Sequence, residues 1–294
     1  MNETQNNQKC FYLGIDGGGT KTKARLEDAD GTLLGEGLAG PSNLVRGTAQ
    51  AVDAFLTASN MAFKEAGLDS SQQLNTSVCI GVAGATVEPY LSELKQWSSP
   101  FQALKITTDL HIALAGAHKG KDGATIIMGT GFCAGIQYTG QYQEIGGHGL
   151  LLGDGGSGAM LGLKSIRLCL EALDGVIAHT TFTRHLLTKL NVEDAHALVT
   201  ATINQPPAFF ATLAPDVFAF ASQQDPLALS VVNDIARFTE RYIVRLQAIK
   251  PVPLSLIGGI SRHIFPYLAS EFQVICKPPQ LTPDQGAVIL AREM

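Results

Sequence analysis

The sequence predicts an α/β protein made of two similar lobes that face a cleft. The main observation is a repeat: a short apolar segment runs into a glycine–threonine turn at residues 12–20, and the same arrangement returns at residues 125–131. Each turn is followed by short strand-like segments and then by helical and strand-like segments in alternation. A duplicated unit of this kind builds two lobes, each with helices packed on a sheet.

Length and composition agree with this organisation. The chain has 294 residues, of which 45% are hydrophobic, and at ~150 residues per domain this length predicts two domains. Its 31 glycines predict many tight turns and places where backbone segments approach closely. We expect an N-terminal lobe at residues 1–118 and a larger C-terminal lobe at residues 119–294, because glycine and charge interrupt the apolar pattern at residues 116–123.

In the first lobe, strands are expected where short apolar runs end at turn residues, and helices where apolar residues recur at helical spacing. The expected strands are residues 11–16, 22–27, 33–38, 77–83 and 104–107, and the expected helices are residues 48–66, 87–97 and 110–118.

In the second lobe the same criteria predict more helices than strands. The last helix, residues 284–292, is expected to pack back on the N-terminal lobe. The expected strands are residues 124–128, 133–138, 142–145, 254–257 and 272–276, and the other helices are residues 157–173, 182–190, 192–202, 209–221 and 226–249.

Charge and cysteine usage argue against several classes of protein. The net charge is −5, which predicts no nucleic-acid partner, because such a surface is basic. No apolar run approaches the ~18 residues of a membrane span, so no membrane partner is expected. The N-terminus is polar, and the five cysteines show no C-x-x-C spacing, which predicts a cytoplasmic protein without a signal peptide, disulfides or a zinc or iron–sulfur site.

Two glycine-rich turns are candidates for phosphate binding. Gly17, Gly18 and Gly19 follow the first strand, and glycine lets backbone N–H groups approach an anion because no Cβ intervenes. Thr20 and Lys21 add a hydroxyl and a cation. Asp16, Thr130 and Gly131 complete the set: the first could hold a magnesium ion through water, and the others form the matching turn of the second lobe. The alternative for each segment is a plain turn.

Two aspartates and a glycine pair are further candidates. Asp109 follows a strand and could be a general base aimed at a hydroxyl, or simply the N-cap of the next helix. Asp154 could bind a polyol or cap a helix, and His148 is expected to be a loop hydrogen-bonding residue rather than a metal ligand. Gly258 and Gly259 could seat a base or ribose, or form an ordinary connection.

The order of the motifs resembles the BadF/BadG/BcrA/BcrD ATPase family. The motifs are Asp-Gly-Gly-Gly-Thr-Lys-Thr at residues 16–22, Pro-Ser-Asn at 41–43, Thr-Asp at 108–109, Gly-Thr-Gly at 129–131, Gly-Asp-Gly-Gly-Ser-Gly at 153–158 and Gly-Gly-Ile-Ser at 258–261. Within the family the chain is most similar to the N-acetylglucosamine and glucosamine kinases. The resemblance implies a duplicated actin/hexokinase-type (ribonuclease H-like) ATPase fold.

The resemblance also implies roles for individual residues, with ATP and Mg²⁺ as cofactors. Asp109 matches the catalytic base and contacts the sugar. Where His148 stands, animal relatives have tryptophan, and where Gly155 stands they have glutamate. The other matches are Gly17–Thr20 and Thr130–Gly131 on the phosphates, Gly258 and Gly259 on adenosine, and Asn43, Gly147, His148, Gly149 and Asp154 on the sugar.

The function expected from these matches is ATP-dependent phosphorylation of the 6-hydroxyl of an amino sugar, N-acetylglucosamine or glucosamine. The alternatives are a kinase for another hexose such as glucose, or a non-catalytic sugar- or ATP-binding regulator of the same fold. A homodimer is the family expectation. The family also contains activators of radical dehydratases, but no cysteine pair here suits their iron–sulfur cluster.

Overall fold

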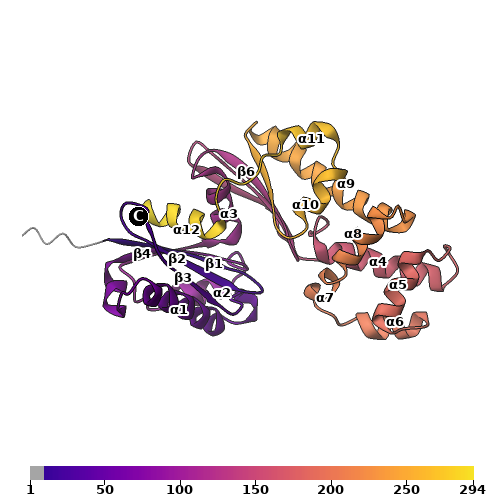
Figure 1. Cartoon of the computed structure of the whole chain (residues 1–294), viewed down its shortest axis with the longest axis horizontal. Coiled ribbons are helices and arrows are strands. Elements are labelled where there is room, and N and C mark those ends of the chain that lie inside the picture. The colour runs from indigo at the N-terminus through magenta and orange to yellow at the C-terminus, as the bar shows by residue number, and fades with distance from the viewer. Residues whose placement is uncertain (1–9) are drawn as a thin grey trace, which may run out of the picture. The chain divides into compact units, whose positions relative to one another are not determined.

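The computed structural model describes residues 10–294, which divide into two units (Figure 1). Unit 1 comprises the chain up to Gly123 together with residues 137–142 and 279–294. Unit 2 comprises residues 124–136 and 143–278. Each unit therefore has its own sheet and core, and two later segments of the chain return to unit 1.

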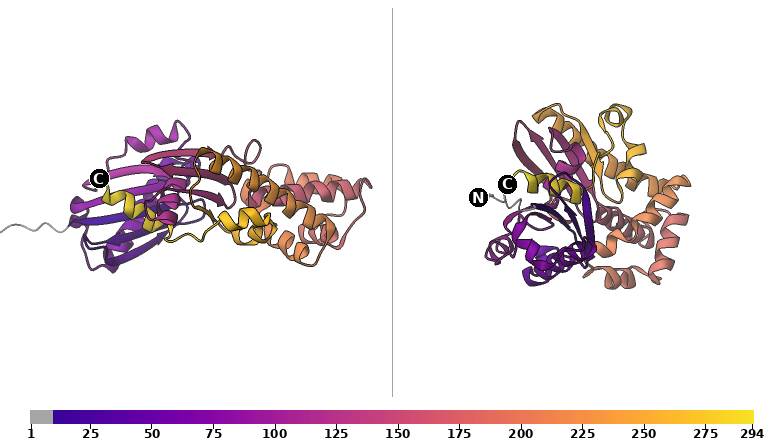
Figure 2. Two further views of the ribbon diagram at one scale, coloured as in Figure 1. Left: turned by 90° about the horizontal axis from the view of Figure 1, so that it is seen from above. Right: turned by 60° about the vertical axis from the view of Figure 1, so that its left-hand side comes forward.

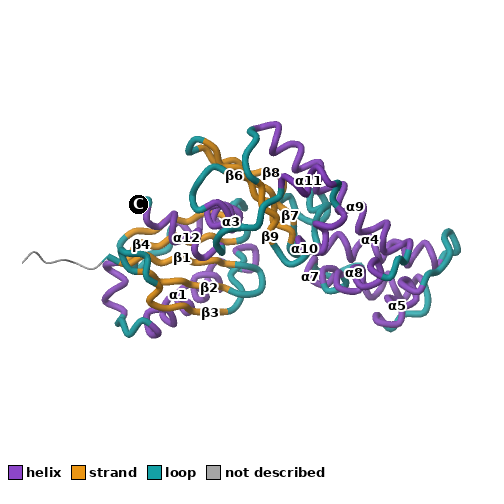
Figure 3. The backbone as a smooth tube through the Cα atoms, turned by 45° about the horizontal axis from the view of Figure 1, so that its top comes forward, coloured by secondary structure: helices purple, strands orange, loops and turns teal. Residues whose placement is uncertain are grey.

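The sheet of unit 1 has five strands in the order β3-β2-β1-β4-β5 (Figure 3). The first three strands are antiparallel, whereas β4 and β5 run parallel to β1. Parallel pairing brings the carboxyl ends of three strands to one edge of the sheet. The strands are β1 (Phe11–Gly17), β2 (Thr22–Glu27), β3 (Leu33–Ala39), β4 (Thr76–Val82) and β5 (Ala103–Thr108).

Helices cover both faces of this sheet (Figure 1). One face packs on α1 (Thr48–Glu65), and the other on α3 (Asp109–His118) and α12 (Pro283–Arg292). Figure 2 shows α12 in yellow beside the indigo strands, so the C-terminal helix belongs to the layer that covers β1. The remaining short helices are η1 (Leu44–Arg46), η2 (Ser70–Asn75) and α2 (Tyr90–Lys95).

Unit 2 has a four-stranded sheet in the order β8-β7-β6-β9. Its helices are concentrated after β8, where the chain makes six helices before returning to the sheet as β9. The strands are β6 (Gly123–Met128), β7 (Phe132–Tyr138), β8 (Gln141–Gly146) and β9 (Leu254–Ile257). The helices are α4 (Gly158–Leu173), α5 (Thr181–Leu190), α6 (Ala195–Thr202), α7 (Pro207–Ala211), α8 (Ala214–Ser222), α9 (Pro226–Ile249), α10 (Ser261–Ile264), η3 (Phe265–Tyr267) and α11 (Ser270–Ile275).

Three predicted elements differ from the structure. The strand expected at residues 272–276 is helix α11, and only Cys276 forms a bridge, to Leu254. Such a short apolar run satisfies strand and helix criteria alike. The helix expected at 209–221 is divided into α7 and α8, because Pro215 is tolerated only in the first turn of a helix. The helix expected at 87–97 begins only after Pro89, because the residue before a proline is disfavoured in helical conformation.

None of the helices described in residues 10–294 is both long and apolar enough to cross a membrane.

Contact between α1 and β3 depends on the absence of a side chain at Gly37. A Cβ at this position would lie 1.9 Å from the carbonyl oxygen of Ala58 in α1. The helix must therefore move if any other residue is present.

We expect Gly37→Ala to lower the free energy of unfolding by about 1–3 kcal/mol, the usual cost of overpacking. The matched control is Gly40→Ala, because a Cβ at Gly40 has no neighbour within 4 Å. Thermal unfolding followed by circular dichroism measures both variants. Equal unfolding midpoints for the two variants would contradict close packing of α1 on β3.

Candidate active site

The first glycine turn presents an open backbone at the end of β1. Gly18 N–H donates to the carbonyl of Lys21 (3.0 Å), and Ser42 N–H donates to the carbonyl of Gly18 (3.0 Å). The turn is thus fixed at its base, while Gly19, Thr20 and Lys21 are exposed. A Cβ at Gly19 would have no protein atom within 4 Å. An anion can therefore reach the backbone here, with the Thr20 hydroxyl and the Lys21 ammonium nearby.

Asp16 and Asp109 come together because of the register of the parallel strands. Asp16 of β1 pairs with Gly81 of β4, and Gly81 pairs with Thr107 of β5. Asp109 follows two residues after Thr107, at the first position of α3. Both aspartates are half-buried at the carboxyl edge of the sheet, where parallel α/β sheets commonly bind ligands.

Burial and neighbouring carboxylates change the acidity of Asp16. Burial and, to a smaller extent, the charges of Asp109 and Asp284 raise its pKa to about 6, against the opposing charges of Lys21 and Lys23. Asp284 belongs to α12 and is itself buried, with its carboxylate 3.1 Å from the Lys23 ammonium. A cation placed beside Asp16 would relieve this concentration of negative charge.

The protein contributes few ligands for a metal ion. Among the described residues, no group of three or more histidine, cysteine, aspartate or glutamate side chains is placed to hold one. Magnesium commonly keeps several waters and binds through one or two carboxylates and substrate phosphates. Asp16 beside the open glycine turn fits such a phosphate-dependent ion.

The structure excludes one of the two roles considered for Asp109, that of N-cap. Thr108, not Asp109, is the N-cap of α3, and its Oγ1 accepts the N–H of His111 at 3.2 Å. Asp109 accepts the N–H of Leu110 at 3.0 Å through Oδ1. The N-cap interpretation of Asp109 is therefore wrong, and its carboxylate is not needed to begin the helix.

Asn43 lies near the same carboxyl edge of the sheet of unit 1. Its Oδ1 accepts the N–H of Val45 at 3.0 Å and caps η1, while the N–H of Leu44 donates to Ala83 (3.1 Å) just after β4. One end of the Asn43 amide is therefore fixed by the backbone. This fixes the orientation of a side chain that can both donate and accept hydrogen bonds.

The second glycine turn, in unit 2, is held by the N-terminus of α4. Gly158 N–H donates to the carbonyl of Gly129 (2.8 Å), and Ala159 N–H donates to the carbonyl of Thr130 (3.3 Å). Behind it, Gly258 has φ +105° and approaches so closely that a Cβ would lie 2.4 Å from the carbonyl oxygen of Met128. The structure thus brings Gly129–Gly131 and Gly258–Gly259 together within one unit.

Asp154 is a buried carboxylate beside this turn. It is 8% exposed, and its Oδ2 would lie 3.0 Å from a Cβ at Gly131. Burial raises its pKa, whereas the N–H groups of Phe132 and Gly149 and the charge of His148 lower it. Its Oδ1 is buried and accepts no hydrogen bond from the described residues. Ser157, rather than Asp154, caps α4 through the N–H of Met160 (3.0 Å), so Asp154 is available for a ligand hydroxyl.

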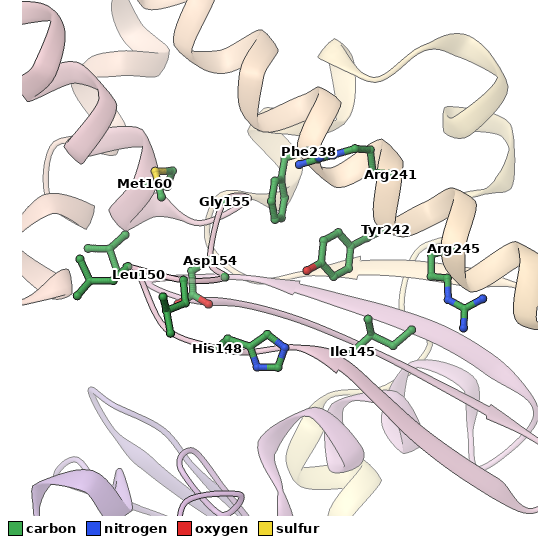
Figure 4. Close-up of a pocket in the computed structure, with 13 residues that line it drawn as sticks. Ile145, His148, Leu150, Asp154, Gly155, Met160, Phe238, Arg241, Tyr242 and Arg245 are labelled. Atoms are coloured by element: carbon green, nitrogen blue, oxygen red, sulfur yellow. The ribbon is translucent and has the colours of Figure 1, made fainter.

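Asp154 and His148 line a pocket of about 530 Å³ (Figure 4). Its other wall is α9, from which Phe238 and Tyr242 project into the pocket, with Arg241 alongside. This wall was not among the predicted site residues. The only signal in the sequence is that the pocket-lining residues Phe238, Arg241, Tyr242 and Arg245 recur at three- and four-residue spacing.

The α9 wall also restricts the size of the residue at position 155. A Cβ at Gly155 would lie 2.3 Å from the ring of Phe238. The ring itself packs edge-on against Phe132, at a centroid distance of 5.2 Å. In this chain an aromatic ring therefore occupies the space beside residue 155. His148 and Gly149 are exposed on the facing loop, and Gly147 N–H donates to the carbonyl of Phe132 (3.1 Å).

A repeated α/β unit with a glycine–threonine turn at a strand end in each copy, and acidic residues beside one turn, defines an ATPase of the duplicated actin/hexokinase type. The chain belongs to the BadF/BadG/BcrA/BcrD ATPase family, whose model matches residues 13–291. The family resemblance predicted from the order of the motifs is thereby confirmed.

Individual relatives agree in fold. The glucosamine kinase of Vibrio cholerae is 30% identical over 281 residues, which cover 96% of this chain and 95% of that protein. The crystal structure of a candidate N-acetylglucosamine kinase from Chromobacterium violaceum is 32% identical, with a TM-score of 0.89 over 97% of this chain and 99% of that one. A ROK family glucokinase from Streptomyces griseus shares the fold alone, at 16% identity and a TM-score of 0.59 over 96% of this chain and 98% of that one. The predicted fold class is confirmed, and the expectation of an ATP-dependent sugar kinase agrees with these names.

The raised pKa of Asp16 has a measurable effect on stability. A carboxyl group whose pKa rises from 3.8 to about 6 on folding destabilises the folded state once it ionises, so stability is lost as the pH rises from about 4 to 6. We expect Asp16→Asn to raise the free energy of unfolding at pH 7 by about 3 kcal/mol, at 1.36 kcal/mol per pKa unit. By pH 4 most of this gain disappears. Urea unfolding at the two pH values measures it, and an equal change at both would contradict the assignment.

Proposed function

We propose that this ATPase-family chain is an ATP-dependent kinase that phosphorylates the 6-hydroxyl of an amino sugar, N-acetylglucosamine or glucosamine. The observation that carries the proposal is the position of Asp109. Its carboxylate is half-buried at the end of a parallel strand, and Thr108 rather than Asp109 caps the helix that follows. The substrate class is supported by the names of the relatives from Vibrio cholerae and Chromobacterium violaceum. In phosphoryl transfer a carboxylate in this position can orient the attacking hydroxyl and accept its proton.

In this proposal the nucleotide is held mainly by backbone groups. Gly17–Thr20 and Lys21 bind phosphate in unit 1, Thr130 and Gly131 bind phosphate in unit 2, and Gly258 and Gly259 bind adenosine. Asp16 would hold Mg²⁺ through water, and the ion would supply charge neutralisation on the phosphate oxygens. The open backbone at Gly19 and Gly259, where a Cβ would have no neighbour within 4 Å, supports this assignment.

The acceptor sugar is assigned to the residues that match the sugar site of the family: Asn43, Asp109, Gly147, His148, Gly149 and Asp154. The buried Oδ1 of Asp154 accepts no hydrogen bond from the described residues, so a sugar hydroxyl would satisfy it. Asp109 would accept the proton of the 6-hydroxyl as that oxygen attacks the γ-phosphorus. The proton can move late in a loose transition state, so an ordinary ionised aspartate is a sufficient base.

We infer further that the enzyme is a cytoplasmic homodimer. All five cysteines are free thiols, which supports a reducing compartment, and the family expectation supports the dimer.

Replacement of the base should separate binding from turnover. We expect Asp109→Asn to lower kcat by ~10²–10⁴ and to leave the Kd of the sugar within a few-fold, because an amide keeps the shape but cannot take the proton. Coupled assays of ADP formation and isothermal titration measure the two quantities. A kcat within tenfold of the wild type would exclude Asp109 as the base.

The same assay with a panel of sugars tests the acceptor. Glucosamine, N-acetylglucosamine, N-acetylmannosamine and glucose should rank with an amino sugar first in kcat/KM. A panel in which glucose exceeds every amino sugar would overturn the amino-sugar assignment. Sugar and ATP binding without any turnover would favour a binding regulator instead.

The nucleotide assignment has a matched pair of variants. We expect Gly19→Val to weaken ATP binding at least tenfold, because the branched side chain stands where the phosphate approaches the backbone. Gly40→Val is the control, since both positions are open and neither should affect folding. Fluorescent nucleotide titration measures affinity. Equal affinity in the two variants, with unchanged unfolding midpoints, would contradict the role of the first glycine turn.

A further inference from the structure

Tyr142, at the start of β8, contacts the residues on both sides of Asp109. Its hydroxyl lies 3.1 Å from Oγ1 of Thr108, the residue before Asp109. Its ring stacks on the ring of His111, with centroids 4.0 Å apart and planes inclined by 14°. Tyr142 belongs to unit 1, as do Thr108, Asp109 and His111.

These contacts form a closed set around the first turn of α3. Oγ1 of Thr108 accepts the N–H of His111 at 3.2 Å, while Oγ1 of Thr107 lies 2.8 Å from Nδ1 of the same histidine. His111 therefore makes hydrogen bonds to both threonines and stacks on Tyr142, and the Tyr142 hydroxyl makes a hydrogen bond to Thr108. Burial lowers the pKa of His111 to about 4, so the ring is neutral near pH 7 and brings no charge to Asp109.

The β7–β8 hairpin holds Tyr142 in place independently of these contacts. Nε2 of Gln137 donates to the carbonyl of Gly120 (3.2 Å), and the N–H of Thr139 donates to Oδ1 of Asp122 (3.0 Å). Both acceptors follow the C-terminal end of α3. The tip of the hairpin is thus bound to residues just after the C-terminus of α3, whereas Tyr142 contacts the N-terminal turn of the same helix.

We propose that Tyr142 is a positioning residue for Asp109. Its hydroxyl restrains Thr108 and its ring supports His111, and these two contacts together fix the orientation of the Asp109 side chain. This inference rests on the proposed role of Asp109 as the base. A displacement of a catalytic group by a fraction of an ångström lowers its rate contribution without abolishing binding. The effect of Tyr142 should therefore fall on kcat and act only through Asp109.

The first experiment removes one hydroxyl. Tyr142→Phe keeps the stack on His111 and loses the contact to Thr108, so we expect kcat to fall about fivefold, the loss of one neutral hydrogen bond at ~1 kcal/mol. The KM values of sugar and ATP should stay within twofold. Tyr138→Phe is the control, because Tyr138 lies in the same hairpin and makes no hydrogen bond through its hydroxyl to the described residues. A kcat for Tyr142→Phe that equals the control would overturn the proposal.

A second pair of variants reaches the same hydrogen bond from the opposite side. Thr108→Ser keeps the hydroxyl and should retain kcat within twofold, whereas Thr108→Val removes it, together with the N-cap of α3, and should lower kcat by at least fivefold. Adding Tyr142→Phe to Thr108→Val should cost nothing further, because the bond is already absent. A further fivefold loss in the double variant would contradict action through Thr108.

A double variant with Asp109→Asn separates positioning from a general effect on folding. Without the base there is nothing to position, so Tyr142→Phe should leave the residual turnover of Asp109→Asn unchanged. A merely structural role would lower that residual rate by the same fivefold, and this result would overturn the proposal. Failure of the base assignment itself is seen separately, as near-normal turnover in the Asp109→Asn single variant.

Discussion

The parallel pairing of β1, β4 and β5 is the constraint on which the candidate site of unit 1 depends. Because the three strands run in the same direction, their carboxyl ends meet at one edge, and Asp16, Gly81 and Thr107 lie in register. Residues far apart in the chain are brought together there by backbone hydrogen bonds. A shift of one residue in either ladder would move side chains to the opposite face of the sheet and separate Asp16 from the residues near Asp109.

The same edge concentrates negative charge, and the fold opposes it with two lysines. Asp284 belongs to α12, almost at the end of the chain, and lies near this edge because α12 packs directly on β1. That contact requires Gly14, where a Cβ would lie 2.2 Å from the carbonyl oxygen of Asp284. The packing of the C-terminal helix thus adds the charge of Asp284 to the effects of burial and of Asp109, which together raise the pKa of Asp16.

In unit 2 the second glycine turn is held in another way, by hydrogen bonds from the N-terminus of a helix. The N–H groups of Gly158 and Ala159, which lack helical partners at the start of α4, donate to the Gly129–Thr130 segment. The loop that leads into this helix carries Asp154, so the Gly129–Gly131 turn and the Asp154 carboxylate are fixed by the same few residues. The aromatic wall of α9 then packs behind them through Phe132 and Phe238.

The sequence by itself determined most strands and helices, the two glycine–threonine turns and the family, because these depend on local periodicity and on turn chemistry. It could not decide whether Asp109 and Asp154 cap helices, since Thr108 and Ser157 stand close by and offer the same oxygen acceptor. It also could not tell helix from strand at residues 272–276, where the apolar run is too short. Only the tertiary structure placed Asp284 near Asp16, Phe238 against Gly155 and Tyr142 on His111, because these pairs are distant in the chain and meet through packing rather than through any local pattern.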